Sequence, residues 1–173
     1  MEAYEAIITR RSIRKYTAQA VPAGLVKELL VAAMSAPSAS NLQPWYFVVV
    51  NERPQLDALT TVLPYGQMLK EAPLAIVVCG DCQRQGTEGF WVQDCSAATQ
   101  NILLAAHARG LGAVWLGVYP REERVQAIRR LLGLPENVTP LCVISIGYPA
   151  EHKAPANRYD ESRVRYNRWS QEP

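Results

Sequence analysis

The sequence predicts a single domain built from both helices and strands. Its 173 residues are the length of one domain. The chain is 49% hydrophobic and 20% charged, a balance typical of globular proteins, which excludes a disordered chain or a fibrous repeat. Continuous apolar runs, typical of strands, alternate along it with segments whose apolar residues recur at helical spacing. We therefore expect one domain over residues 1–173 that buries its own core.

Each helix and strand of this domain is placed by its own pattern. The strands are runs rich in β-branched and aromatic residues, and WYFVVV and LAIVVC are expected to be buried. Pro22 suits the first turn of a helix that Pro37 ends, and Gly110 suits the end of the longest helix. In chain order we expect helices over residues 1–9 and 25–33, a strand over 45–50, a helix over 53–60, a strand over 74–79, a helix over 89–109, a strand over 112–118, a helix over 121–132 and a strand over 141–146.

The last segment, residues 149–173, differs in character from the rest of the chain. It is rich in charged residues and prolines, so it cannot form a core by itself. Its aromatic residues Tyr159, Tyr166 and Trp169 are expected to lie on another surface, and a partner subunit is a candidate. A frayed terminus is the alternative.

The charge and the cysteine content limit the possible binding partners and the cellular compartment. The 18 basic and 16 acidic residues leave a net charge of +2, so we expect no nucleic-acid partner and no membrane attachment. No apolar run reaches the roughly 20 residues that span a bilayer, and the first residues do not resemble a secretory signal. With only four cysteines, the chain is expected to be cytoplasmic with free thiols.

Residues 10–14, with the sequence RRSIR, place three arginines and a hydroxyl close together. Arginine side chains match phosphate oxygens in pairs, and Ser12 adds a further donor, so a compact anion site is one interpretation. The alternative is a solvated basic turn at the end of a helix, where the helix dipole favours cations.

The loop PSASNLQP, residues 37–44, concentrates hydroxyl and amide side chains before a strand. Amides both donate and accept hydrogen bonds, so Asn41 and Gln43 suit the polar edge of a heterocycle. An ordinary connection between a helix and a strand is the alternative.

Two further motifs do not support the functions that they first suggest. In GLGAVWLG the third glycine of a dinucleotide-binding fingerprint would fall on Trp115, and the glycines open a strand, which excludes a Rossmann site. Gly117 would still allow a flat ligand to approach the backbone. Cys79 and Cys82 form a CxxC pair, but it has no further zinc ligands at suitable spacing and closes a strand, so we expect no metal and no redox role.

The long helix carries two polar residues, and no catalytic triad or carboxylate pair is recognisable. Asp94 is expected to be a buried partner for an arginine, and His107 a cation in the last turn. If the protein is an enzyme, a cofactor therefore carries the chemistry.

Taken in order, the segments RRSIRKY, PSASNLQPWYFVVV, GLGAVWLGVYP and SIGYPAE, followed by a basic and aromatic tail, resemble the FMN-dependent nitroreductase family. The resemblance covers essentially the whole chain, as a member of minimal length. It implies an α+β fold with a central, mostly antiparallel sheet flanked by helices. It also implies an intertwined homodimer whose C-terminal arm, residues 149–173, crosses to the partner and whose FMN lies at the interface.

The same resemblance implies that both subunits contact each FMN. Arg14 would lie near the pyrimidine edge of the ring, where a fixed cation stabilises the negative charge of the reduced flavin near N1 and O2. The phosphate and ribityl chain would be held by Arg10, Arg11 and Ser12, joined by Arg158 from the tail. The reactive edge of the ring would be approached by Leu116 and Gly117. The other subunit would supply Pro37, Ser38, Ser40, Asn41 and Gln43.

The implied activity is transfer of a hydride from NADH or NADPH, through flavin N5, to a nitroaromatic, a quinone or a similar small acceptor in ping-pong order. A non-catalytic flavin-binding dimer and an oxygen-dependent flavin-fragmenting enzyme are the alternatives. A lid over the site is expected from residues 51–73 and 83–92. Within it Tyr65, Phe90 and Trp91 either face the ring or pack in the core.

Overall fold

The fold is a four-stranded antiparallel sheet with helices on both faces. It is seen in a computed structural model that describes residues 1–84 and 89–169. In chain order the elements are α1 (Ala3–Thr9), α2 (Ala23–Met34), η1 (Ala39–Asn41), β1 (Trp45–Val50), α3 (Arg53–Val62), η2 (Gln67–Lys70), β2 (Leu74–Asp81), α4 (Trp91–Ala108), β3 (Gly112–Gly117), α5 (Glu122–Leu132), β4 (Val138–Gly147) and η3 (Glu161–Arg163), where η marks a short 3₁₀ helix.

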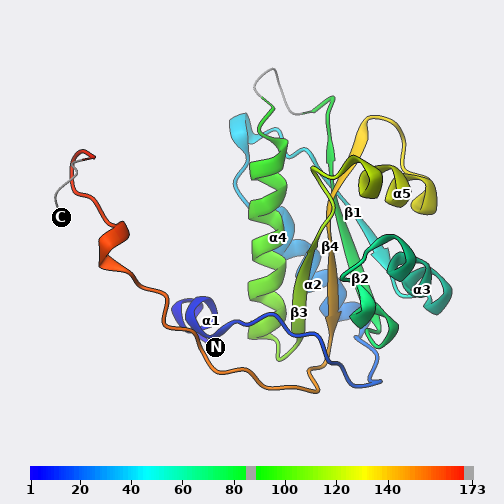
Figure 1. Ribbon diagram of the computed structural model, residues 1–173, viewed down its shortest axis with the longest axis horizontal. Coiled ribbons are helices and arrows are strands. Elements are labelled where there is room, and N and C mark those ends of the chain that lie inside the picture. Colours follow the sequence, from blue (N-terminus) through cyan, green and yellow to red (C-terminus); the bar gives the residue numbers. More distant parts are fainter. Residues whose placement is uncertain (85–88, 170–173) are drawn as a thin grey trace.

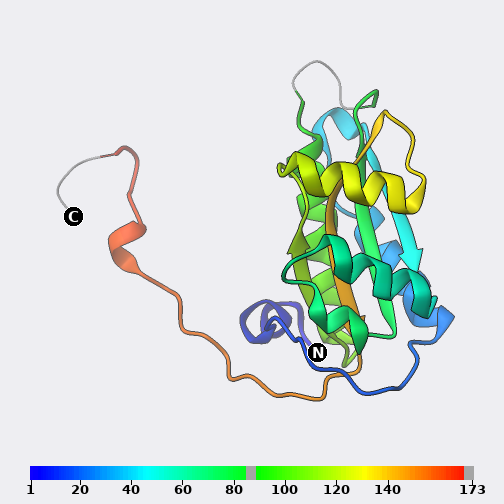
Figure 2. The same ribbon diagram turned by 45° about the vertical axis from the view of Figure 1, so that its right-hand side comes forward.

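The sheet has the strand order β1-β2-β4-β3, and every neighbouring pair is antiparallel. The strands β2 and β4 are therefore central, and β1 and β3 are the edges. Helices α2 and α4 cover one face of the sheet, and α3 and α5 cover the other (Figure 1; Figure 2). The fold is the α+β arrangement with a mostly antiparallel sheet that the sequence predicted.

Alternating side chains of the central strands supply a core on each face of the sheet. In β4, Ile144 and Ile146 pack on the side of α2 and α4, whereas Val143 packs on the side of α3 and α5. Because successive residues of a strand point to opposite faces, one apolar run serves both cores. This explains why the central strands appear in the sequence as continuous apolar runs rather than as alternating ones.

The predicted elements agree with the observed ones except in their ends and in the burial of β1. The strand β4 begins at Val138, earlier than the run LCVISI suggested. The prediction that β1 is buried was wrong for this chain, because β1 is an edge strand on which Tyr46 is 46% and Val49 38% exposed. Strand β2 is buried along its whole length, as expected. No helix in the described part of the chain is long and apolar enough to cross a membrane.

The chain after β4 has two parts with different surroundings. Residues 148–154 run beside residues 11–17: Tyr16 pairs with Pro149, and the Ala150 N–H donates to the Lys15 carbonyl at 2.9 Å. Residues 155–169 then leave the body of the molecule (Figure 1; Figure 2). The exposed fractions of their aromatic side chains are high: Tyr159 75%, Tyr166 79% and Trp169 82%. The last four residues of the predicted arm, and residues 85–88 of the predicted lid, lie outside the described residues.

One close contact joins the N-terminal segment to the sheet. Ile13 is buried and packs against Gly112, the first residue of β3. A Cβ atom added at Gly112 would lie 2.6 Å from Cγ2 of Ile13, closer than real side chains approach. Glycine is therefore required for residues 12–14 to lie against the edge of the sheet.

We predict that Gly112→Ala lowers the free energy of unfolding by about 1–3 kcal/mol, because overpacking displaces both the side chain and the backbone. Gly24→Ala is the matched control, because a Cβ atom there meets no atom within 4 Å. It should leave stability unchanged or raise it by roughly 0.5–1 kcal/mol, the gain of alanine over glycine in a helix. Denaturant unfolding of both variants tests this, and equal stabilities would contradict the close packing.

Candidate functional site

The arginine-rich segment is extended and pairs with the free edge of β3. Ser12 forms a parallel bridge with Ala113, and the Ile13 N–H donates to the Ala113 carbonyl at 3.1 Å. Ile13 is buried, whereas Arg14 is exposed. Successive side chains of an extended segment point to opposite sides, so Ser12 and Arg14 project away from the small core that contains Ile13.

Arg10, Arg11 and Arg158 lie close together beside the end of α1, whereas Arg14 of the same predicted cluster lies at a separate cavity. Partial burial lowers the pKa of Arg10, and the positive charges of Arg11 and Arg158 lower it further. Among the described residues no carboxylate forms an ion pair with any of the three. Like charges held together at a partly buried position are unfavourable unless an anion joins them.

Arg11 is already engaged with the backbone. Its guanidinium donates to the carbonyls of Arg10 and Ile8, both at 2.6 Å, and to that of Ala154 at 3.0 Å. It therefore satisfies the free carbonyls at the end of α1, which is the structural role that the helix-end interpretation suggested. The guanidinium groups of Arg10 and Arg158 form no hydrogen bond within the described chain, unlike that of Arg11.

His107 lies beside the same arginines but is not the cation that its position in the helix suggested. The Thr9 hydroxyl donates its proton to the Glu5 carbonyl at 2.6 Å, so it accepts from Nε2 of His107 at 2.8 Å. Burial lowers the pKa of His107, and the charges of Arg10 and Arg11 lower it further. The imidazole is thus neutral at pH 7 and ties α1 to the last turn of α4.

A second part of the predicted site is a cavity of about 180 Å³ at the end of β3. It is lined by Arg14, Leu116 and Gly117, the three residues that the family resemblance assigns to the FMN ring. A Cβ atom at Gly117 would meet no atom within 4 Å, so there is open space over its backbone. Two arginines and no carboxylate contribute to the walls, which are formed by Arg14, Leu63, Pro64, Tyr65, Trp115, Leu116, Gly117 and Arg124.

Sequence reasoning missed Arg124 and left the aromatic lid residues open. Arg124, in the first turn of α5, donates to the Gly117 carbonyl at 3.0 Å, and nothing local in the sequence indicates this contact. Tyr65 lines the cavity and is 79% exposed, as a residue facing a ligand would be. Trp91 is buried and packs edge to face on Tyr119, so the core interpretation holds for it. Phe90 is 41% exposed and is not among the residues that line this cavity.

The loop of hydroxyls and amides, residues 37–43, is strained and internally bonded. Ser40, Asn41 and Gln43 have φ angles of 50°, 55° and 49°, a region that residues other than glycine seldom adopt. The Gln43 N–H donates to Oγ of Ser38 at 3.0 Å, and its side-chain amide donates to Asn41 Oδ1 at 2.8 Å. Such strain persists only where the surroundings enforce it, and it is frequent at binding sites.

The two halves of the predicted site lie at opposite ends of α4. Asp94, in the first turn, accepts a hydrogen bond from the loop backbone at 3.0 Å, rather than pairing with an arginine as predicted. His107, in the last turn, binds Thr9 beside the arginines. The two residues are thirteen positions apart in α4, a rise of roughly 20 Å along the helix. One chain therefore cannot bring Asn41 and Gln43 to the arginines.

The cysteines show no feature of a reactive or metal-binding site. All four thiols are free. Burial raises the pKa of Cys79 to about 12 and that of Cys142 to about 12, so both stay protonated at neutral pH. Across residues 1–84 and 89–169, no group of three or more potential metal ligands is found.

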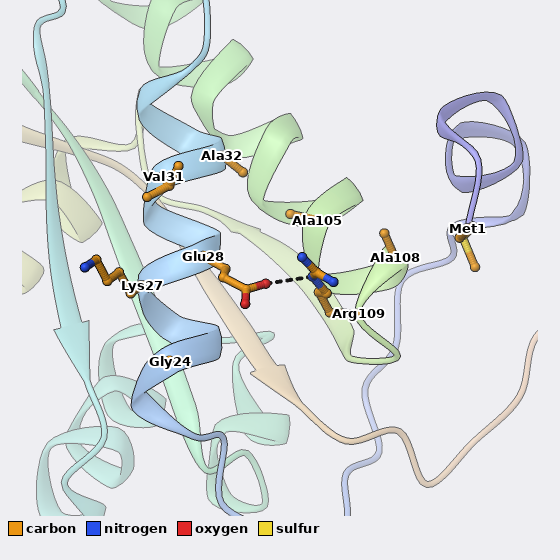
Figure 3. A pocket seen from close by; sticks show the side chains of 9 residues that line it. All are labelled: Met1, Gly24, Lys27, Glu28, Val31, Ala32, Ala105, Ala108 and Arg109. Carbon is orange, nitrogen blue, oxygen red and sulfur yellow. Dashed lines mark ion pairs between the residues drawn. The ribbon is translucent and has the colours of Figure 1, made fainter.

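A groove of about 750 Å³ lies between α2 and α4, and none of the predicted site residues is among those that line it (Figure 3). Glu28 of α2 and Arg109 at the end of α4 face each other across it and form an ion pair at 2.7 Å. The remaining walls are largely small or apolar: Met1, Gly24, Lys27, Val31, Ala32, Ala105 and Ala108.

Comparison with known proteins identifies the family. The family model described as "Nitroreductase family" matches residues 7–61 and 51–148. A protein of Methanothermobacter thermautotrophicus named "Putative NADH dehydrogenase/NAD(P)H nitroreductase" is 53% identical over 169 residues, covering 98% of this chain and 88% of that protein.

Solved structures agree in fold over almost the whole chain. An FMN-dependent nitroreductase of Clostridium difficile has a TM-score of 0.90 and 35% identity, over 96% of this chain and 99% of that one. An NADPH:FMN oxidoreductase of Vibrio harveyi, complexed with NAD+, has a TM-score of 0.86 and 27% identity, over 98% of this chain and 78% of that one. From its sequence, its antiparallel sheet and these likenesses, the chain belongs to the nitroreductase family.

Proposed function

We propose that this protein is an FMN-dependent oxidoreductase that transfers a hydride from NADH or NADPH to a nitroaromatic, a quinone or a similar small acceptor. Its family is one of NAD(P)H-dependent flavin oxidoreductases, and relatives with the same fold are named for FMN and NADPH. The observation that supports the proposal is the cationic cavity lined by Arg14 and Gly117. An arginine cluster without acidic partners lies close to Arg14 in the chain.

The residues of this chain fit the two chemical parts of FMN. The phosphate requires cations and donors, and Arg10, Ser12 and Arg158 supply them with no competing carboxylate in the described chain. Arg11 adds its charge while it holds the end of α1. The flat ring requires open space beside a backbone, which Gly117 provides next to Leu116.

Bound FMN supplies a ring that accepts a hydride and passes it on, and the protein binds and orients the reactants. Arg14 places a fixed positive charge beside the ring, where negative charge develops during reduction. Because this chain forms one such cavity beside Gly117, we propose that NAD(P)H and the acceptor use it in turn, in ping-pong order. The four free thiols favour a reducing cytoplasm as the location.

We further propose that the protein acts as a homodimer with composite sites. Pro37, Ser38, Ser40, Asn41 and Gln43 would reach the arginines only from a second copy, because α4 keeps the two groups apart within one chain. Exposed apolar side chains on α1 and α2, together with the groove between α2 and α4, favour a face that a second copy covers. Residues 149–173 would then cross to the partner, where the aromatic residues of the arm find a surface.

We predict that the purified protein is yellow, with the absorption band of bound FMN, and that NADH or NADPH bleaches it under anaerobic conditions. Colour without bleaching would favour the non-catalytic flavin-binding dimer. A colourless protein that takes up no added FMN would reject both functions.

Substitutions of the arginines should separate affinity from reactivity. Arg14→Ala is expected to weaken FMN binding and slow its reduction by NAD(P)H, whereas Arg10→Ala or Arg158→Ala should raise the Kd for FMN by about tenfold or more through loss of a charged hydrogen bond. In Arg10→Ala and Arg158→Ala, the redox potential of the FMN that still binds should change little. Arg130→Ala, on the exposed side of α5, is the control. Unchanged affinity and kinetics in Arg14→Ala would refute its assignment.

The composite site predicts complementation between two defective chains. A chain with Arg10→Ala and Arg14→Ala and a chain with Asn41→Ala and Gln43→Ala should each bind FMN poorly. After the two are refolded together, mixed dimers carry one site with all residues intact, so about a quarter of the sites should bind FMN normally. Titration with FMN measures this fraction, and no recovery despite dimer formation would show that each site belongs to a single chain.

A further inference from the structure

Two charged side chains of the segment 148–154 bind the backbone of Ser12 and Arg14. Oε1 of Glu151 accepts a hydrogen bond from the Arg14 N–H at 2.5 Å. Nζ of Lys153 donates to the Ser12 carbonyl at 2.8 Å and pairs with Glu151 at 3.2 Å. The side chain of Glu151 is only 19% exposed, and that of Lys153 is 36% exposed. The three contacts form one connected network on the side of the segment that β3 does not cover.

The network leaves the ligand-facing side chains free. The Glu151 carboxylate binds the backbone of Arg14 and the ammonium of Lys153, and it forms no ion pair with the guanidinium of Arg14 within the described chain. The hydrogen bond from Arg14 is the main cause that lowers the pKa of Glu151, so the carboxylate is ionised at neutral pH. A charge-assisted hydrogen bond is short and directional, which suits it to fixing a backbone.

We propose that Glu151 and Lys153 are positioning residues of the FMN site, which act through the backbone of Arg14 and of Ser12. Glu151 sets the direction in which Arg14 enters the cavity beside Gly117. Lys153 sets the position of Ser12 at the phosphate end. This inference rests on the proposed function, because it concerns the same site, but neither residue is required to touch the ligand.

The sign of the change in redox potential separates this role from a simple electrostatic one. If Glu151 acted only through its charge, its removal would make the potential of bound FMN more positive, because a negative charge near the reduced ring would be lost. If Glu151 positions Arg14, its removal weakens the interaction of the ring with a fixed cation. The potential then becomes more negative.

The test uses full-length Glu151→Ala and Lys153→Met, with the exposed Glu123→Ala on α5 as control. The Kd for FMN, the two-electron potential of bound FMN and the thermal unfolding of the apoprotein are measured. Glu151→Ala should raise the Kd by about tenfold, as for loss of a charged hydrogen bond, and shift the potential to more negative values. Lys153→Met should raise the Kd and leave the potential unchanged. Glu151→Gln, which keeps an acceptor for the Arg14 N–H, should restore most of both properties.

Other outcomes overturn the inference. A positive or absent shift in potential for Glu151→Ala would show that Arg14 has not moved. Equal effects of Glu151→Ala on the potential in wild type and in an Arg14→Ala background would show that Glu151 does not act through Arg14. If wild type binds FMN and both variants match Glu123→Ala, this inference fails alone. If wild type binds no FMN, the proposed function fails with it.

Discussion

Residues 11–17 form an extended segment that is held on both sides, and the positions of Ser12 and Arg14 in the candidate site depend on this pairing. On one side Ile13 bonds to Ala113 of β3, and on the other the Thr17 N–H donates to the Tyr148 carbonyl at 2.9 Å. Two isolated β-bridges and these hydrogen bonds therefore hold the segment in an extended form. Side chains that project from a backbone held in this way lose little freedom when they bind a ligand, which favours a precise site.

Cations without acidic partners are the second feature of the site. Arg11 has a structural role, because its guanidinium donates hydrogen bonds to three backbone carbonyls. Arg10 and Arg14 have no such partners within the described residues. Desolvation and mutual repulsion of these positive charges destabilise the fold. A ligand with a phosphate and an electron-accepting ring would offset this destabilisation when it binds.

The length of α4 sets the remaining constraint. The strained amide loop is tied to its first turn through Asp94, and the arginines are tied to its last turn through His107. A rigid helix cannot bend to bring its own ends together. The amide loop and the arginines can therefore contact one ligand only if the loop comes from a second copy of the chain. The exposed aromatic arm and the groove between α2 and α4 are then the surfaces that such a copy would cover.

The sequence by itself determined the helices and strands and the chemistry of the candidate residues, because apolar periodicity and side-chain type are local properties. The resemblance to the nitroreductase family indicated Arg14, Leu116 and Gly117, which the structure places around one cavity. Only the tertiary structure decided that β1 is an exposed edge, that Arg124 holds Gly117, and that Glu151 holds Arg14 across 137 residues of chain. Periodicity reports which side chains of an element are apolar, whereas their exposure and their partners depend on which strands become neighbours in the sheet.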